Sequence, residues 1–204
     1  MNQHNALKAK PTDQKDYTDS LLTRQSKWWK KLLNVQYPYK RNIISLKPGF
    51  VLDIGCGVGR NLLHLNGNGI GVDHNATSVK QCLSQGLRAF TNAEFEQTEY
   101  YTPGTFDSIL LAHVAEHMTQ NETGQLLAGY QHLLKKNGRI IVITPQEAGF
   151  KSDDTHVAFT DFEKVQSIFN QLGYQSIKQY SFPFPRFVGK FFKYNEFVSI
   201  AGKL

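Results

Sequence analysis

The sequence has few residues of the kinds that mark secreted or membrane proteins. It contains two cysteines, Cys56 and Cys82, and their surroundings form neither a disulfide framework nor a CxxC metal motif. Residues 1–16 are polar and lack the apolar core of a secretory signal. No apolar run approaches the roughly 20 residues needed to cross a bilayer. We therefore expect a cytoplasmic protein without a transmembrane segment.

Two common nucleotide-binding motifs are also absent, although residues 55–59 form a glycine-rich turn with the sequence GCGVG. In the dinucleotide fingerprint G-x-G-x-x-G, the third glycine after Gly55 and Gly57 would stand at the position of Arg60. No Gly-Lys-Ser/Thr follows, so the turn is not a P-loop. We therefore expect a ligand other than a pyridine dinucleotide or a nucleoside triphosphate.

The composition is that of a folded globular chain with a mild basic excess. Hydrophobic residues make up 40% of the sequence, charged residues 20%, and the formal net charge is +6. The positive charge is scattered, so it does not select nucleic acid, a membrane surface or an anionic substrate as the partner. The length of 204 residues suits one domain with a small appendage.

Apolar runs alternate with helical patterns from residue 50 onward. Runs typical of buried strands lie at residues 50–54, 69–73, 89–90, 106–112 and 139–144. Helical patterns lie at residues 59–65, 76–85, 123–136 and 159–172, the third with Asn137-Gly138 as its expected C-cap. The alternation predicts a mostly parallel sheet with helices on both faces. Residues 176–182 and 196–201 predict two last strands joined by a loop, and hence an antiparallel pair.

Residues 1–45 are predicted to form an N-terminal extension. After a polar tail, residues 16–35 have the pattern of an amphipathic helix that carries Trp28 and Trp29 and is broken by Tyr37-Pro38-Tyr39. Such a helix either covers the ligand pocket as a lid or packs on the sheet. Residues 46–204 would then form the ligand-binding domain.

Two carboxylates flank the glycine turn. Asp53 lies two residues before Gly55, where it would repel a pyrophosphate and attract a cation. Asp73 ends the next predicted strand, close to the spacing of about 20 residues at which an acid binds ribose hydroxyls. The pattern predicts a site for a ribose beside a positive charge. S-adenosylmethionine has this profile, because it carries a ribose, an ammonium and a sulfonium.

Four segments resemble, in order, the motifs of class I S-adenosylmethionine-dependent methyltransferases. They are VLDIGCGVGRN (51–61), GVDHN (71–75), FDSILLAHVAEHM (106–118) and LLKKNGRIIVITP (133–145). The resemblance covers residues 48–204 and departs from the family at Asn137, where proline or glycine is usual, and in AFTNAEF, which lacks the common Gly-Asp. It implies an α/β Rossmann-like fold with a mostly parallel seven-stranded sheet, a final antiparallel strand and helices on both faces. It also implies S-adenosylmethionine as cofactor and S-adenosylhomocysteine as product.

The same resemblance implies a set of cofactor-binding residues after the first four strands. Among them, Asp53 would hold the amino group and Asp73 both ribose hydroxyls, while His74, Asn92 and Ala93 would contact the adenine. The glycines would line the methionine and the ribose. The full predicted set is Asp53, Gly55, Cys56, Gly57, Gly59, Asn61, Asp73, His74, Asn92, Ala93 and His113.

A histidine-rich string, H-x-x-E-H, follows the fourth predicted strand. Its members His113, Glu116 and His117 would share one face of a helix, and His156 follows the fifth strand. An inverted zincin site needs this string inside a long helix, so we set protease chemistry aside. In some members of the resembled family, including RNA-end methyltransferases, a similar string and a later histidine hold a divalent ion. That alternative stays open here without being favoured.

His117 and His156 are the candidate catalytic residues. Either would serve as a general base toward a hydroxyl or would orient the acceptor. The structural alternative is that the Glu116-His117 pair only packs this turn.

We expect a small-molecule acceptor that is methylated at oxygen. Residues 144–147 should edge its pocket, and the aromatic and basic loop at 183–195 leaves a peripheral membrane contact open. A nucleic-acid partner is not favoured, because no broad basic groove is evident. The alternatives are a metal-assisted RNA-end methyltransferase and a non-catalytic cofactor-binding module, and the intact Asp53 and Asp73 count against the second.

Overall fold

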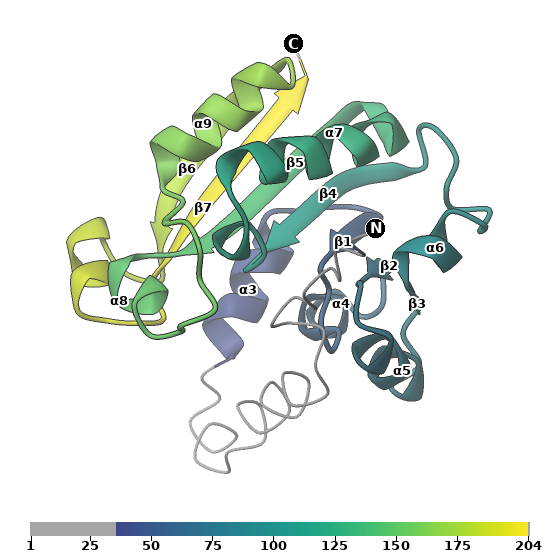
Figure 1. The fold of residues 1–204 in the computed structure, drawn as a ribbon, viewed down its shortest axis with the longest axis horizontal. Coiled ribbons are helices and arrows are strands. Elements are labelled where there is room, and N and C mark those ends of the chain that lie inside the picture. The colour runs from purple at the N-terminus through teal and green to yellow at the C-terminus, as the bar shows by residue number, and fades with distance from the viewer. Residues whose placement is uncertain (1–35, 204) are drawn as a thin grey trace, which may run out of the picture.

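The structure is a computed structural model that describes residues 36–203 of the chain (Figure 1). Its strands are β1 (Val51–Ile54), β2 (Gly69–Val72), β3 (Ala89–Phe90), β4 (Phe106–Ala112), β5 (Leu134–Pro145), β6 (Tyr174–Phe182) and β7 (Glu196–Lys203). Its α-helices are α3 (Tyr37–Ser45), α4 (Arg60–His64), α5 (Ala76–Ser84), α6 (Asn92–Phe95), α7 (Gln120–Tyr130), α8 (Glu147–Phe150) and α9 (Phe162–Gln171). Three 3-10 turns are η2 (Ala115–His117), η3 (Gln131–Leu133) and η4 (Arg186–Lys190).

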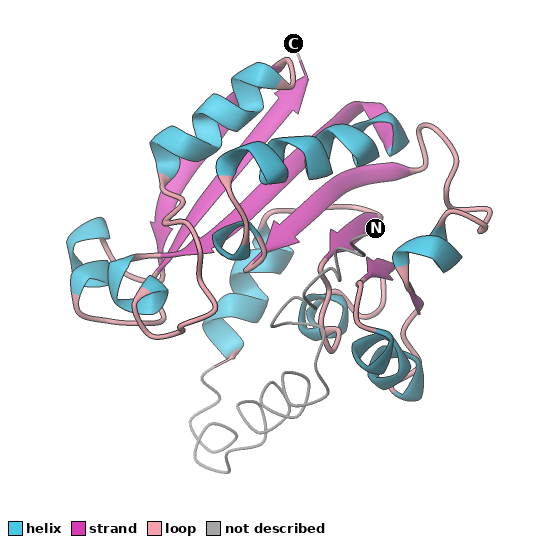
Figure 2. Ribbon diagram, in the orientation of Figure 1, coloured by secondary structure: helices cyan, strands magenta, loops and turns pink. Residues whose placement is uncertain are grey.

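The strands form a seven-stranded sheet in the order β3-β2-β1-β4-β5-β7-β6, with helices on both faces (Figure 2). Neighbours from β3 to β5 pair in parallel, and β7 runs antiparallel to both β5 and β6. The predicted fold class and its closing antiparallel strand are confirmed. The predicted helix at residues 16–35 lies outside the described residues. Within residues 36–203, no helix has the length and apolar character needed to span a bilayer.

Alternating side chains of the central strands divide the core between the two faces of the sheet. In β4, Ile109 and Leu111 join a cluster with Leu127 of α7 and Phe169 of α9. Leu110 points to the other face and joins a cluster with Ile43 of α3. Because successive side chains of a strand point to opposite faces, a continuous apolar run such as FDSILLA is what a strand covered on both sides requires.

Glycines in β2 allow the first part of the chain to pack tightly on the sheet. A Cβ at Gly71 would lie 2.7 Å from Sγ of Cys56 and 2.9 Å from Cδ1 of Leu62. Both neighbours are buried in a cluster with Cys82, and both cysteines are free thiols. The bare backbone at Gly71 therefore brings the glycine turn and α4 close to the strand that ends in Asp73.

The predicted helix at residues 123–136 has different limits in the structure. It begins earlier, at Gln120, because Thr119 and Glu122 form a capping box, and it ends at Tyr130. Leu134 instead pairs with Phe106 across the sheet, so β5 starts there and Asn137-Gly138 is not a helix cap. Sheet pairing overrides the helical preference of the two lysines in this segment.

The tripeptide Tyr37-Pro38-Tyr39, predicted to break a helix, begins α3. Pro38 lies in the first turn, where its missing N–H group leaves no hydrogen bond unmade. The helix buries Ile43 against the sheet. This packing places Tyr39 and Asn42 beside the carboxyl ends of the central strands.

Candidate functional site

The candidate site lies at the carboxyl ends of β1, β2 and β4. The chain turns back at this point, since β2 and β4 flank β1 on opposite sides. In open α/β sheets, ligands bind in the crevice outside the strand ends where the strand order reverses. The glycine turn follows β1 directly and therefore lies at this crevice.

The turn keeps its backbone bare for steric reasons. Gly55, Gly57 and Gly59 have φ values of 68°, 54° and 81°, a region that side-chain-bearing residues rarely adopt. A Cβ at Gly55 would collide with the side chain of Val114, and one at Gly59 with that of Leu87. The turn thus requires glycine at these positions, and its shape is held by hydrogen bonds that the N–H groups of Gly55, Gly57 and Gly59 donate within the protein.

Asp53 is a deeply buried acid near the end of β1. It lies just before the turn with 1% of its surface exposed, and neither carboxylate oxygen has a hydrogen bond in the described structure. Burial raises the pKa of Asp53 to about 7, although the nearby side chain of Asn61 opposes this shift. A buried carboxylate without a partner is costly, so the site favours a cation that would compensate it.

Asp73, at the end of β2, is tied to the glycine turn. Its Oδ2 accepts a hydrogen bond from the Gly57 N–H at 2.8 Å, and its Oδ1 accepts one from the Asn75 N–H at 2.8 Å. Nδ1 of His74 lies 3.5 Å from Oδ1. The second acid is therefore held at the edge of the crevice in a fixed orientation.

The remaining predicted cofactor residues lie around this crevice with different exposures. Asn61 and His113 line one small cavity together with Arg60 of α4. Asn92 and Ala93 are exposed at the start of α6, beyond β3. Cys56 is buried beneath the turn, so it borders the crevice through its backbone while its thiol packs inward. Whether each residue contacts the cofactor stays a prediction.

His113 follows β4 in a strained conformation. Its φ of 60° is uncommon for a residue with a side chain. Its Nε2 lies 2.8 Å from Oε1 of Glu196, and its Nδ1 lies 3.3 Å from Oε1 of Glu116. Although burial opposes it, interaction with Glu116 and Glu196 raises the pKa of His113 to about 9. The imidazole is therefore a cation at neutral pH, held between two acids.

The structure brings the two candidate catalytic histidines together. The rings of His117 and His156 are 4.9 Å apart between centroids, and His156 stacks on Phe150 of α8 at 5.3 Å. Only Ala115–His117 is helical, as the single turn η2, so His113 does not share a helix with Glu116. The loop after β5 is fixed to this turn, since Val157 N–H donates to the Glu116 carbonyl at 2.7 Å.

A polar network that sequence reasoning missed supports this side of the site. Gln146 is fully buried and donates to Ser181 Oγ at 2.8 Å and to the Glu196 carbonyl at 2.9 Å. Asn195 donates to Oε1 of Gln146 at 3.0 Å. Asn195 and Glu196 lie here because β7 is antiparallel, so it begins where β5 ends. In the sequence, the predicted antiparallel pair of last strands was the feature that could have indicated the position of these two residues.

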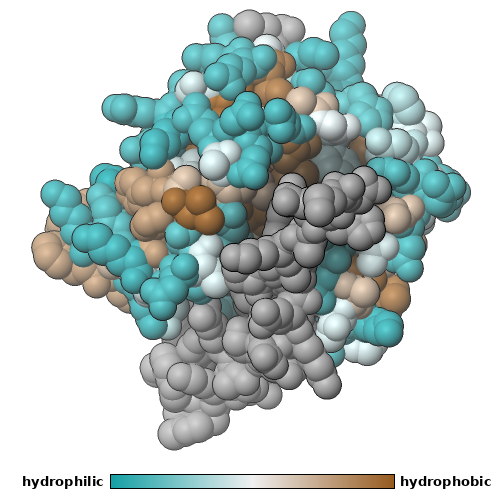
Figure 3. Space-filling model, in the orientation of Figure 1, coloured by the Kyte–Doolittle hydropathy of each residue, from teal (hydrophilic) through white to brown (hydrophobic). Residues whose placement is uncertain are grey.

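A loop rich in exposed aromatic side chains borders the same edge of the sheet. Phe184, Phe187, Phe191 and Tyr194 are all exposed between β6 and β7. Figure 3 shows hydrophobic atoms gathered along the left side of the molecule, where this loop and α8 lie. Arg186, on the same loop, forms a two-point pair with Glu147 at 2.5 and 2.7 Å.

Comparison with known proteins gives the class of this site. Residues 52–142 match the model of a family described as a methyltransferase domain. An uncharacterized methyltransferase of Bacillus cytotoxicus is 30% identical over 124 residues, which are 56% of this chain and 57% of that protein. The chain thus matches little more than half of that relative's length.

Solved structures share the fold over most of the chain. A SAM-dependent methyltransferase from Archaeoglobus fulgidus has a TM-score of 0.65 at 20% identity, covering 87% of this chain and 100% of that one. Magnesium protoporphyrin IX methyltransferase from Synechocystis, with bound SAH, has a TM-score of 0.62 at 16% identity, covering 93% and 97%. The chain is thus similar to methyltransferases in two respects: residues 52–142 match the family model, and the fold is that of solved S-adenosylmethionine-dependent methyltransferases. The resemblance drawn from the sequence is confirmed.

Proposed function

We propose that the protein transfers a methyl group from S-adenosylmethionine to a small-molecule acceptor, at an oxygen atom. The observation that carries this proposal is the buried, unpaired carboxylate of Asp53 beneath a glycine turn that no side chain can fill. An ammonium group is the ligand chemistry that such a carboxylate favours. Structures of related fold that contain SAM or SAH support the same cofactor.

The residues of the chain have separable tasks in this proposal. When bound, the cofactor supplies a methyl group on a positively charged sulfur. Asp53 would pair with its ammonium, and Asp73 would accept hydrogen bonds from the ribose hydroxyls. Because methyl transfer is an in-line displacement, the main work of the site is to align the acceptor and exclude water. His117 or His156 would be the partner for the proton of an acceptor hydroxyl.

The acceptor side favours a small molecule over a nucleic acid. Its charged side chains are paired with one another, Arg186 with Glu147 and His113 with Glu116 and Glu196, so this edge of the sheet does not offer a broad basic groove to a phosphate backbone. The exposed phenylalanines between β6 and β7 would instead suit an acceptor with an apolar or aromatic part.

Calorimetry on the full chain tests the cofactor. We expect S-adenosylhomocysteine to bind, and Asp73→Asn to weaken binding at least roughly 100-fold, because it loses a charge-assisted hydrogen bond and the anchor of the glycine turn. Asp107→Asn is the matched control, since Asp107 lies near the opposite end of β4 and pairs with Lys135. The proposal would be overturned if a pyridine dinucleotide gave binding heat while S-adenosylmethionine and S-adenosylhomocysteine gave none.

Mass spectrometry of products tests the acceptor. The protein should be incubated with labelled cofactor and a panel of phenols, hydroxy acids, amines and RNA oligonucleotides. Methylation confined to hydroxyl-bearing small molecules is expected, and methylation of the RNA alone would contradict the proposed acceptor class.

A further inference from the structure

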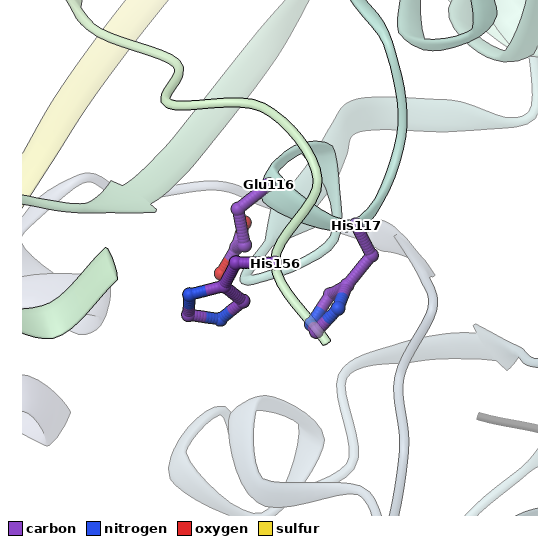
Figure 4. A group of neighbouring side chains, drawn as sticks. All are labelled: Glu116, His117 and His156. Atoms are coloured by element: carbon purple, nitrogen blue, oxygen red, sulfur yellow. The ribbon is translucent and has the colours of Figure 1, made fainter. Parts of the chain in front are cut away.

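Three side chains from two segments converge at the acceptor side of the site. Glu116 and His117 come from the turn η2, and His156 comes from the loop after β5 (Figure 4). One ligand atom from each residue can be chosen so that all three lie within 4.8 Å of one another. Two imidazoles and a carboxylate are a donor set that binds divalent transition metals.

Hydrogen bonds engage the same nitrogen, Nδ1, of both imidazoles. Nδ1 of His156 lies 2.7 Å from the Phe150 carbonyl, and Nδ1 of His117 lies 3.1 Å from the Thr155 carbonyl. A carbonyl oxygen only accepts, so each Nδ1 carries the hydrogen. The hydroxyl of Thr155, 3.2 Å from Nδ1 of His117, already donates to Asp153 and so acts as an acceptor here too. Each Nε2 therefore carries the lone pair, as in metal-bound histidines whose other nitrogen is held by a backbone oxygen.

The carboxylate of Glu116 is the most deeply buried member of this cluster. Its residue is 1% exposed, and neither oxygen has a hydrogen bond in the described part of the chain. The 3.3 Å contact with Nδ1 of His113 is an ion pair without hydrogen-bond geometry. His113 also contacts Glu196 at 2.8 Å through its Nε2, so this imidazole lies between two acids. A divalent ion would give the Glu116 oxygens the partner that they lack among the described residues.

We infer that Glu116, His117 and His156 bind a divalent transition-metal ion of the zinc class, which holds the acceptor hydroxyl for methyl transfer. This inference rests on the proposed function. Imidazole donors favour zinc, manganese or iron(II) over magnesium. Both imidazoles are half-buried, so protein covers one side of the ion and its remaining positions open toward the acceptor. Metal–nitrogen bonds of about 2.1 Å put neighbouring ligands about 3.4 Å apart, so we expect the imidazoles to move inward on binding.

If the ion is bound, the two histidines act as metal ligands and not as general bases. Coordination lowers the pKa of a bound hydroxyl, so its proton leaves to solvent before transfer. The oxygen–carbon bond then forms while the sulfur–carbon bond breaks, and the electron pair of that bond remains on the neutral sulfur. In this arrangement Glu116, His117 and His156 hold the metal, and the ion, rather than an imidazole, stabilises the oxyanion.

Metal binding is tested on the full chain, without an affinity tag, after removal of bound metals with a chelator. Zinc titration by calorimetry should show one equivalent, and cobalt(II) should give visible absorption bands typical of nitrogen and oxygen ligation. His156→Gln, His117→Gln and the isosteric Glu116→Gln should each weaken zinc binding at least roughly 100-fold. His132→Gln is the matched control, because His132 contacts Tyr101 away from the cluster and should leave zinc binding unchanged.

The outcomes separate this inference from the proposed function. Wild-type affinity in all three variants, or no zinc binding by the unmodified chain, would overturn the metal site even if S-adenosylhomocysteine still binds. Zinc bound at one equivalent and lost in the variants would support the site even if no sulfur nucleoside binds, in which case the proposed function alone would fail. Circular dichroism on each variant shows whether a loss reflects the missing ligand or a failure to fold.

Discussion

The two halves of the site differ in whether backbone or side-chain atoms form most of them. The proposed cofactor half consists of the backbone of residues 55–59 and two carboxylates at the ends of neighbouring strands. The proposed acceptor half consists of side chains from η2, the loop after β5 and the start of β7. A site made of backbone requires particular residues at a few adjacent positions, so it appears in the sequence as a short motif. A site made of converging side chains depends on how distant segments pack.

The largest expected effect comes from adding a side chain to the glycine turn of the cofactor half. Gly55→Ala places a Cβ at φ 68° and against Val114, whereas Gly86→Ala at φ 75° meets no atom within 4 Å. We expect Gly86→Ala to lower the free energy of unfolding by about 1 kcal/mol and Gly55→Ala by about 3 kcal/mol. Urea denaturation measures both. Equal losses would show that the collision with Val114 is relieved at no cost.

The same pair of variants separates binding from stability. We expect Gly55→Ala to weaken cofactor binding more than roughly 100-fold, because Val114 or the turn must move into the ligand's space. Gly86→Ala should bind as the unmodified protein does. Calorimetry with S-adenosylhomocysteine distinguishes the two, and a normal affinity for Gly55→Ala would mean that the turn does not contact the cofactor.

A smaller effect is expected from breaking the polar network of the acceptor half. Asn195→Ala removes the donor to Gln146 and to the Phe184 carbonyl and leaves buried acceptors less satisfied. The free energy of unfolding should fall by about 2 kcal/mol. Asn170→Ala on the exposed face of α9, which removes one surface hydrogen bond to Gln166, should change it by less than about 0.5 kcal/mol.

The Asn195→Ala variant also tests whether a change in the acceptor half alters cofactor binding in the other half. Cofactor affinity should stay within about twofold in Asn195→Ala, since distant sites without shared partners act additively. A large loss of cofactor affinity would show that the two halves form one coupled unit.

The smallest expected effect is a pH dependence confined to the cofactor half. Burial raises the pKa of Asp53 to about 7, so between pH 6 and 8 its ionised fraction rises about tenfold. Affinity for a ligand that carries an ammonium should rise by about the same factor, because pairing requires the carboxylate. Calorimetry in buffers of different ionisation enthalpy should show a proton released on binding near pH 6. Asp53→Asn should bind weakly at every pH.

The free protein should show the opposite trend in stability. The ordinary pKa of an aspartate is 3.8, so between that pH and 7 the folded state keeps a proton that the unfolded state has lost. The free energy of unfolding therefore falls as pH rises through this window. In Asp53→Asn this contribution should disappear, and a persistent slope would have to come from another group.

The difference between the two halves also sets how far the sequence alone could reach. The glycine turn and its acids were predicted because their spacing is local and their strands carry plain apolar runs. Asn195 and Glu196 were missed because their place depends on the direction of β7, a long-range property. The limits of α7 and β5 were wrong for the same reason, since the pairing of Leu134 with Phe106 decides them. The roles of His117 and His156 stay predictions.

The reversed direction of β7 has a consequence for how this fold can vary. Because this strand enters the sheet at the edge where the parallel strands leave it, residues 183–195 border the proposed acceptor side while remaining outside every ladder of strand pairing. This segment is free to change in length and chemistry without shifting the hydrogen bonds of the sheet. We expect relatives with the same methyl donor to differ most in this segment, so that one type of cofactor-binding site can be combined with different acceptors.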